Sequence, residues 1–263
     1  MKPKRIWSWL WIIVGGLYFI IPLVATFLFS LQAKKSGPSL VAYQRVFSDP
    51  NFYKTFLFSL EAAIITILVS MLLVVPAAYW IRIKLPQLRV ITEFVTMMPF
   101  VIPAIVLVFG LIRVYSGPPF YVTNTMAGTN TLLVGAYFII TLPYMYRAVD
   151  NGLASINVRA LTEAAQSLGA GWGRILLRII FPNLRTAILS GALLTVTAVI
   201  GEYAIAAFLV GIKAFGPYMN LLGGNRTYES MALAIISFFL AWGLTGMIQF
   251  ASRGRTEGLP SVK

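Results

Sequence analysis

The chain has 263 residues, of which 59% are hydrophobic and 11% are charged, against roughly 25% charged residues in an average soluble domain. This composition excludes an ordinary water-soluble protein and indicates a membrane protein. The absence of cysteine and histidine excludes disulfides, histidine-ligated metals and Ser-His-Asp catalysis, so we expect neither catalytic residues nor a metal site. The basic residues, which give a net charge of +13, lie between apolar runs, which is typical of membrane topology rather than of nucleic-acid binding.

Six apolar segments are candidates for transmembrane helices, which need about 20 apolar residues each. The first, between Arg5 and Lys34, has 28 uncharged residues, too many for the apolar core of a signal peptide, so we expect it to be retained. The others lie between Glu61 and Arg82, between Glu93 and Arg113, from Leu132 to Tyr146, from Arg185 past Glu202 to about Gly211, and between Glu229 and Arg253. The sequence therefore predicts an all-α, polytopic membrane protein with six transmembrane helices in one domain, residues 1–263.

Two prolines in the third segment, Pro99 and Pro103, stand four residues apart. Each removes a helical hydrogen bond. They indicate either a bend in this segment or the ordinary use of proline in a membrane helix.

Lysine and arginine are distributed unequally between the two sides of the membrane that these segments define. With the N-terminus inside, the inside segments hold 14 of the 21 basic residues and the outside segments hold 7. The inside segments are 1–5, 82–93, 147–185 and 252–263, and the outside segments are 32–56, 113–131 and 202–230. Because cytoplasmic segments carry such an excess, we expect both termini to be cytoplasmic.

The longest inside segment, residues 147–185, has the pattern of two short helices. Asn157 can cap the first helix, and Gly169 stands where a glycine would end it. The expected apolar face of this helix consists of Leu161, Ala164, Ala165 and Leu168. The second helix, which Pro182 would stop or kink, is amphipathic and is expected to lie at the membrane surface. Its apolar face consists of Trp172, Ile175, Leu176 and Ile179, and Arg174 and Arg178 lie opposite.

The same loop contains a longer motif. Glu163-Ala164-Ala165, Gly169, Ile179 and Pro182 match the pattern E-A-A-x3-G-x9-I-x-L-P, with Phe181 in place of the usual leucine. This is the EAA motif, and the sequence thereby resembles the inner-membrane permease subunits of binding-protein-dependent ABC importers. The motif also precedes the last two predicted spans, as it does in that family. The resemblance implies a type I importer permease fold over the whole chain.

The resemblance also implies what this chain contacts. The EAA loop would be a coupling helix that docks into a cleft of an ATP-binding subunit, through Glu163, Ala164, Ala165, Leu168 and Gly169. The partners would be a second permease, two ATP-binding subunits, a periplasmic or extracellular substrate-binding protein and the lipid of a bacterial inner membrane. The chain has no G-x-x-x-x-G-K-[ST] motif, so ATP and Mg would bind the partner subunits, and this chain would be a transport subunit without a cofactor rather than an enzyme.

Glu202 and Tyr203 interrupt the fifth apolar segment. An intramembrane carboxylate usually faces a cavity or a partner, so Glu202 would either line the substrate path or its gate, or lie at the outer interface or against a neighbouring helix. Tyr203 could offer an aromatic face to a cation or simply pack.

The substrate is suggested by a resemblance and by Glu202. The string SLGA after the EAA residues resembles the branch that includes spermidine/putrescine, iron, sulfate and phosphonate permeases. Together with the carboxylate of Glu202, it leads us to expect a polyamine or a related small organic solute. A secondary transporter or channel, which would also have six spans but would not need the EAA motif, is the alternative.

Overall fold

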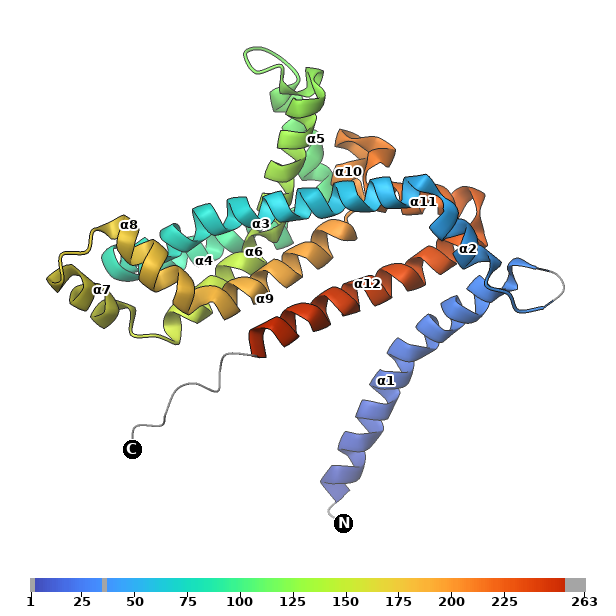
Figure 1. The fold of residues 1–263 in the computed structure, drawn as a ribbon, viewed down its shortest axis with the longest axis horizontal. Coiled ribbons are helices and arrows are strands. Elements are labelled where there is room, and N and C mark those ends of the chain that lie inside the picture. Colours follow the sequence, from blue (N-terminus) through green and yellow to red (C-terminus); the bar gives the residue numbers. More distant parts are fainter. Residues whose placement is uncertain (1–2, 35–36, 254–263) are drawn as a thin grey trace. The chain divides into compact units, whose positions relative to one another are not determined.

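The computed structural model describes residues 3–34 and 37–253, and these residues are helical with no strand among them (Figure 1), which confirms the all-α class. The α-helices are α1 (Pro3–Ser30), α2 (Val41–Ser48), α3 (Pro50–Lys84), α4 (Arg89–Met97), α5 (Ala104–Tyr115), α6 (Met126–Ala154), α7 (Val158–Ser167), α8 (Trp172–Ile175), α9 (Phe181–Ile200), α10 (Ala204–Leu209), α11 (Phe215–Asn225) and α12 (Thr227–Arg253). The chain forms two compact units, one of Met1–Lys54 with Tyr218–Gly243 and one of Thr55–Pro217 with Leu244–Lys263. That the whole chain is one transmembrane domain stays a prediction. The first residues and the C-terminal residues to Lys263, on which the predicted location of the termini depends, lie outside the described part.

Four helices are long and apolar enough to cross a membrane, namely Trp7–Ala33, Pro50–Lys84, Met126–Ala154 and Trp172–Ile200. A fifth crossing is possible if the bent pair Pro86–Phe100 and Ala104–Tyr115 counts as one, and Thr227–Gly243 is a shorter apolar helix. The multi-pass architecture is therefore observed, whereas the predicted number of six spans is not confirmed by helix length and composition in the described residues.

The third predicted span is a pair of helices that meet at an angle of 98°. Pro99 lies in the first turn of a 3-10 segment that follows α4, and Pro103 has an extended ψ of 138° just before α5. Because neither proline can donate a backbone hydrogen bond, the helical ladder ends between them. The bend sends α4 against α6 and α5 against α10, so of the two readings of this proline pair the structure favours the bend.

The larger unit, Thr55–Pro217 with Leu244–Lys263, is built around α6 and α9, which lie side by side (Figure 1). One buried cluster joins these two helices to α3 and α8 and includes Tyr79, Met145 and Ile175. A second cluster joins α6 to α5 and α10 and includes Tyr137 and Ile205. In lipid, such contacts stabilise the fold mainly through close van der Waals packing, because apolar surface gains little by leaving an apolar solvent.

The smaller unit is held together by polar contacts near the ends of its helices. A nitrogen of Arg45 in α2 lies 2.9 Å from a carboxylate oxygen of Glu229 in α12. The hydroxyl of Tyr218 in α11 donates to Asp49 at 3.0 Å. Burial and this hydrogen bond raise the pKa of Tyr218 above its ordinary value, so the hydroxyl stays protonated and remains a donor.

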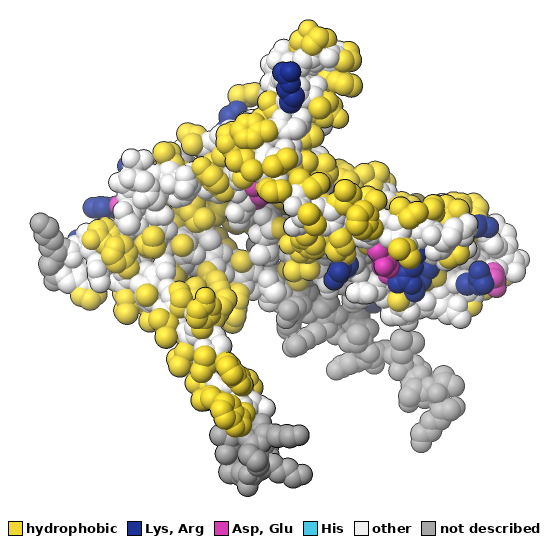
Figure 2. Space-filling view, turned by 180° about the vertical axis from the view of Figure 1, so that it is seen from behind, with side chains coloured by type: hydrophobic (Ala, Val, Ile, Leu, Met, Phe, Trp, Pro, Cys, Tyr) yellow, Lys and Arg dark blue, Asp and Glu magenta, His cyan; other side chains and the backbone are white. Residues whose placement is uncertain are grey.

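Large apolar side chains cover much of the surface. None of the residues in the most apolar window of α1 is buried, and Leu72 of α3 is among the most exposed apolar side chains of the larger unit. Figure 2 shows hydrophobic side chains over much of one face and charged side chains in a few separate places. This is the surface expected of a protein whose solvent is lipid rather than water.

Candidate functional site

Both ends of α7 are capped as the sequence predicts. The side-chain oxygen of Asn157 accepts a hydrogen bond from the backbone N–H of Ala160 at 3.1 Å, which satisfies one of the free donors of the first turn. At the other end Gly169 has a φ of +78°, and the N–H groups of Gly169 and Ala170 donate to the carbonyls of Gln166 and Ala165, both at 2.9 Å. These two bonds are the Schellman motif, which needs a left-handed residue and therefore favours glycine.

One face of α7 anchors it to the larger unit. Val158, Thr162 and Ala165 are buried, and the hydroxyls of Thr162 and Tyr79 are hydrogen-bonded at 2.9 Å. Since Tyr79 belongs to α3 and is fully buried, α7 is fixed to the end of a membrane-spanning helix.

The other face of α7 is exposed and contains most of the EAA residues. Glu163 and Ala164 are exposed, and Leu168, at the end of the helix, is 87% exposed. The predicted apolar face was wrong in part, because Ala165 and Leu168 lie in different surroundings and the polar Thr162 belongs to the buried side. Hydrophobic periodicity missed this division because the buried face includes a threonine whose hydroxyl is satisfied by Tyr79.

The second helix of the loop begins at Trp172 as predicted, with Ile175 buried and Arg174 exposed. The ring of Trp172 lies 4.8 Å from that of Trp80, between centroids, and the amino group of Lys84 lies 5.5 Å from the Trp172 ring, within the range of a cation–π contact.

Of the two predicted effects of Pro182, a stop of this helix was wrong, and a kink stays a prediction. The helix is continuous with the fifth span, and Trp172–Ile200 forms one apolar helix. A π-helical segment, Leu176–Ile180, lies just before the proline. In a π-helical turn each backbone N–H donates to the carbonyl five residues earlier instead of four. This change of hydrogen-bond partners lets the helix continue through Pro182, which has no N–H to donate. The interhelical loop is correspondingly shorter than residues 147–185, because α6 continues to Ala154.

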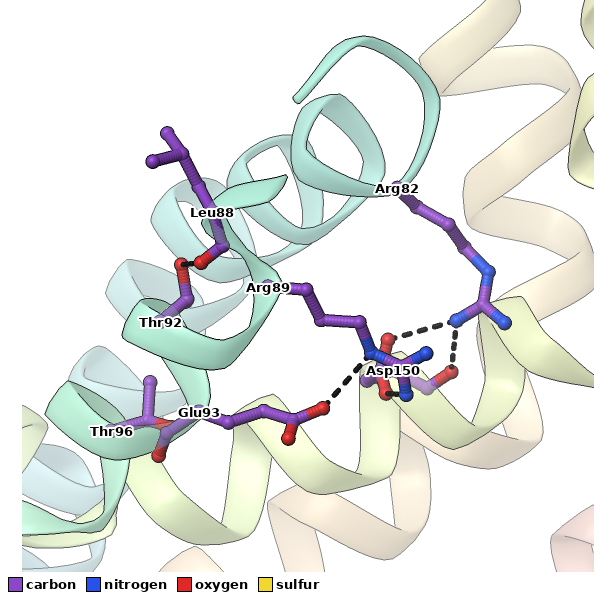
Figure 3. A network of polar contacts seen from close by, with 7 residues as sticks. All are labelled: Arg82, Leu88, Arg89, Thr92, Glu93, Thr96 and Asp150. Carbon is purple, nitrogen blue, oxygen red and sulfur yellow. Dashed lines mark hydrogen bonds and ion pairs between the residues drawn. The ribbon is translucent and has the colours of Figure 1, made fainter. Parts of the chain in front are cut away.

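A charged network next to this loop was not found by sequence reasoning. Asp150 of α6 accepts a hydrogen bond from Arg82 of α3 at 2.8 Å and one from Arg89 of α4 at 3.2 Å. Arg89 also lies 2.9 Å from Glu93, four residues along α4. Figure 3 shows the side chains of Arg82 and Arg89 converging on Asp150. No spacing rule connects Arg82, Arg89 and Asp150, because they come from three separate segments.

Glu202 does not lie within a membrane helix, which corrects the predicted fifth span. That span ends at Ile200 rather than near Gly211, and a break at residues 201–203 precedes α10. The carboxylate oxygens of Glu202 accept hydrogen bonds from the backbone N–H groups of Ile205 and Ala206, at 2.9 and 3.1 Å. Glu202 thus caps the first turn of α10, where a negative charge is favourable.

The backbone of Glu202 is closely approached by α11. A Cβ atom at Gly216 would collide with the backbone carbonyl of Glu202, so glycine permits the close approach of α11 to this break. Tyr203, by contrast, is 48% exposed. The structure therefore keeps Glu202 and Tyr203 adjacent at a helix break, far along the chain from the EAA residues.

Comparison with known families identifies most of the chain. Residues 75–252 match the model of the family described as binding-protein-dependent transport system inner membrane component. This range includes α7, the Asp150 network and Glu202.

Two kinds of curated relative are similar to the chain. A probable sulfate transport system permease protein, cysT, of Chlorokybus atmophyticus is 28% identical over 257 residues, which cover 90% of this chain and 87% of that protein. The spermidine/putrescine transport system permease protein PotB of Escherichia coli strain K12 is 27% identical over 191 residues, which cover 67% of this chain and 66% of that protein.

Solved importers have a similar fold. A chain of a bacterial ABC transporter involved in the import of the acidic polysaccharide alginate aligns with a TM-score of 0.72 and 15% identity, covering 97% of this chain and 98% of that chain. A chain of the inward-facing MetNI methionine ABC transporter aligns with a TM-score of 0.59 and 18% identity, covering 78% of this chain and 98% of that one. The fold is thus that of ABC importer permeases.

Proposed function

The chain belongs to the family of binding-protein-dependent transport system inner membrane components, and we propose that the exposed face of α7 docks onto the ATP-binding subunit of the importer. The family consists of multi-pass inner-membrane permeases, so the chain is a permease subunit of an ABC importer and not an enzyme. The alternative of a secondary transporter or channel is set aside by the family.

The observation that carries this proposal is the division of α7 into an anchored face and a free one. Val158, Thr162 and Ala165 hold the helix to the larger unit, whereas Glu163, Ala164 and Leu168 are exposed. The exposed residues Glu163 and Ala164, together with Leu168, form a narrow surface that can enter a groove of a partner, where Leu168 would be the apolar anchor. A glutamate there can pair with a basic residue of the partner.

The anchored face explains how docking would move the membrane helices. A force on α7 passes to α3 through the bond between Thr162 and Tyr79, and to α8 and α9 through the short turn at Gly169. We propose that closure of the ATP-binding subunits shifts these helices between two packed states, which is alternating access by population shift.

The remaining partners are part of the same proposal. We propose a second permease, two ATP-binding subunits and a substrate-binding protein, with ATP and Mg on the ATP-binding subunits. The EAA resemblance supports this set. One of the similar solved structures is described as an alginate ABC transporter in complex with an alginate pentasaccharide-bound periplasmic protein.

Site-specific cross-linking tests the docking surface, and the absence of native cysteine makes the background clean. Ala164→Cys and Leu168→Cys are each labelled with a photoactivatable maleimide before the ATP-binding subunit is added. Both variants should form a covalent adduct with that subunit, because both side chains are exposed on the proposed face. The adduct is measured by gel mobility and mass spectrometry.

The matched control is Asn124→Cys, an exposed position between α5 and α6 in a predicted outside segment. It should be labelled equally and give no adduct. Adduct formation at residue 124, or none at residues 164 and 168 in an importer that hydrolyses ATP, would contradict the docking assignment.

For the substrate, we propose a polyamine or a related small organic cation, with Glu202 and Tyr203 on its path or at a gate. The carboxylate of Glu202 has about four acceptor positions, and the N–H groups of α10 use two of them. The remaining positions can accept hydrogen bonds from an ammonium group, next to the exposed ring of Tyr203. The relatives named for spermidine and putrescine support this class, although sulfate permeases are equally similar.

Uptake by the reconstituted importer tests this assignment. Labelled spermidine should be transported and labelled sulfate should not. Glu202→Gln should weaken the apparent affinity for spermidine by about tenfold to a hundredfold, because a hydrogen bond to a charged group contributes roughly 1.5 to 3 kcal/mol. Glu202→Asp, which keeps the charge, is the control and should lose less. Uptake of sulfate in place of spermidine would overturn the polyamine assignment and leave the permease function intact.

A further inference from the structure

A cavity of about 540 Å³ lies between α4 and the C-terminal half of α6. It is separate from the exposed face of α7 and from Glu202. Polar and apolar side chains both line it: Arg89, Val90, Glu93, Phe94, Met97, Tyr146, Arg147, Asp150 and Asn151. A ligand for this cavity therefore needs a charged or polar part and an apolar part.

The charged groups around the cavity are not balanced. Arg82, Arg89, Glu93 and Asp150 are connected to one another by ion pairs (Figure 3). Arg147 takes part in no ion pair among the described residues, and its guanidinium donates instead to the sulfur of Met97 at 3.5 Å, a weak acceptor. One positive charge is therefore left over in the cavity wall, which favours an anion.

The rim of the cavity is apolar and exposed. Val90 is 76% exposed and Phe94 is 69% exposed, and both belong to the wall of the cavity. In a membrane permease such side chains face acyl chains rather than water. A phospholipid joins a phosphate directly to acyl chains, so its two parts match Arg147 and this rim.

The position of Arg147 along α6 fits the headgroup level. It directly follows the apolar stretch that ends at Tyr146, and α6 has 29 residues, a length of about 43 Å at 1.5 Å per residue. The hydrocarbon core is only about 30 Å thick, so the end of α6 extends beyond it. The guanidinium of Arg147 can then meet phosphate oxygens, for which its planar geometry is well suited.

We propose that this cavity binds the phosphate of an anionic phospholipid, with Arg147 as its main ligand and the acyl chains against Val90 and Phe94. The lipid stabilises the junction of α4 and α6, because a ligand that binds only the folded arrangement stabilises it by mass action. The binding is independent of the docking of α7, so one can hold without the other.

The experiment measures lipid retained by the purified importer complex after reconstitution in nanodiscs. Wild type in phosphatidylglycerol should retain the lipid through detergent extraction, as seen by native mass spectrometry, and in phosphatidylcholine it should not. Arg147→Gln should retain about fivefold less phosphatidylglycerol, given the usual contribution of one basic residue at a membrane surface. Arg174→Gln, which removes an exposed arginine from α8, should retain as much as wild type.

A second arm distinguishes a lipid from a free anion. Inorganic phosphate at millimolar concentration should not displace the retained lipid, since it lacks the apolar part. Displacement by phosphate would identify a free-anion site and overturn the lipid assignment. Equal retention by wild type and Arg147→Gln, or no retained phosphatidylglycerol in wild type, would overturn the site itself.

Discussion

Gly169 shows how a single residue can determine the shape of a proposed docking surface. Its φ of +78° lies in a region that is costly for any residue with a Cβ atom and most costly for a β-branched one. The space around it is otherwise open, since a Cβ atom would meet nothing within 4 Å. The requirement for glycine is therefore conformational and not steric.

Gly169→Val should weaken binding of the ATP-binding subunit by about tenfold. A valine at this position would leave the left-handed region in the free permease, and returning it there when α7 docks would cost roughly 1 to 2 kcal/mol. Affinity is measured by titrating the ATP-binding subunit onto the permease in nanodiscs. The control is Gly173→Val, an equally open position within α8 where the backbone is helical, and it should bind like wild type. Equal affinity of the two variants would show that the turn at Gly169 does not support docking.

At the same scale, local rules predicted the caps well and the environment of charged groups poorly. Asn157 and Gly169 were found because capping depends on neighbours within a few residues. Glu202 was placed inside a span because its flanking residues are apolar, yet its carboxylate caps α10. A hydropathy average depends only on the composition of a segment. It cannot distinguish the interior of a helix from a helix break at which a carboxylate caps the next helix.

At the level of helices, the sequence predicted which segments are apolar and gave their limits less well. Pro99 and Pro103 produce a 98° bend, whereas Pro182 is accommodated by the π-helical segment Leu176–Ile180. The two outcomes differ because packing, and not the proline, decides whether the freed backbone groups find other partners. Ile175, just before the π segment, and Ile180, its last residue, are fully buried, so the helix is fixed by its neighbours there.

The Asp150 network was beyond prediction for a related reason. Its members come from the end of α3, the start of α4 and the last turns of α6, and only the fold brings these together. The carboxylate of Asp150 is only 15% exposed and has two guanidinium partners, so removal of either partner would leave a half-buried charge less well compensated. The Asp150 network joins α3, α4 and α6 next to the loop that contains α7. The end of α7 at Gly169, by contrast, was predicted from the sequence.

For the whole molecule, the larger unit groups the segments that the charge distribution assigns to the same side. The predicted inside segments 82–93 and 147–185 meet at the Asp150 network and at the contact of Lys84 with Trp172. The predicted outside segment 202–230 contributes Ile205 to a buried cluster, and Tyr115 and Val122 of the predicted outside segment 113–131 pack against that cluster. This grouping is what a consistent topology requires. The prediction that the side of α7 is cytoplasmic rests on the excess of basic residues and stays a prediction.

Cysteine accessibility tests that orientation in a chain that has no native cysteine. Ser155→Cys lies between α6 and α7, and Asn124→Cys lies between α5 and α6; both residues are exposed. A membrane-impermeant maleimide should label residue 124 in intact spheroplasts and residue 155 only after permeabilisation, because the excess of basic residues predicts that residue 155 lies on the cytoplasmic side. Labelling is measured by gel shift, with total accessible cysteine determined after permeabilisation as the control. The reverse pattern would place α7 on the side opposite to ATP, and the docking proposal would fail together with the predicted topology.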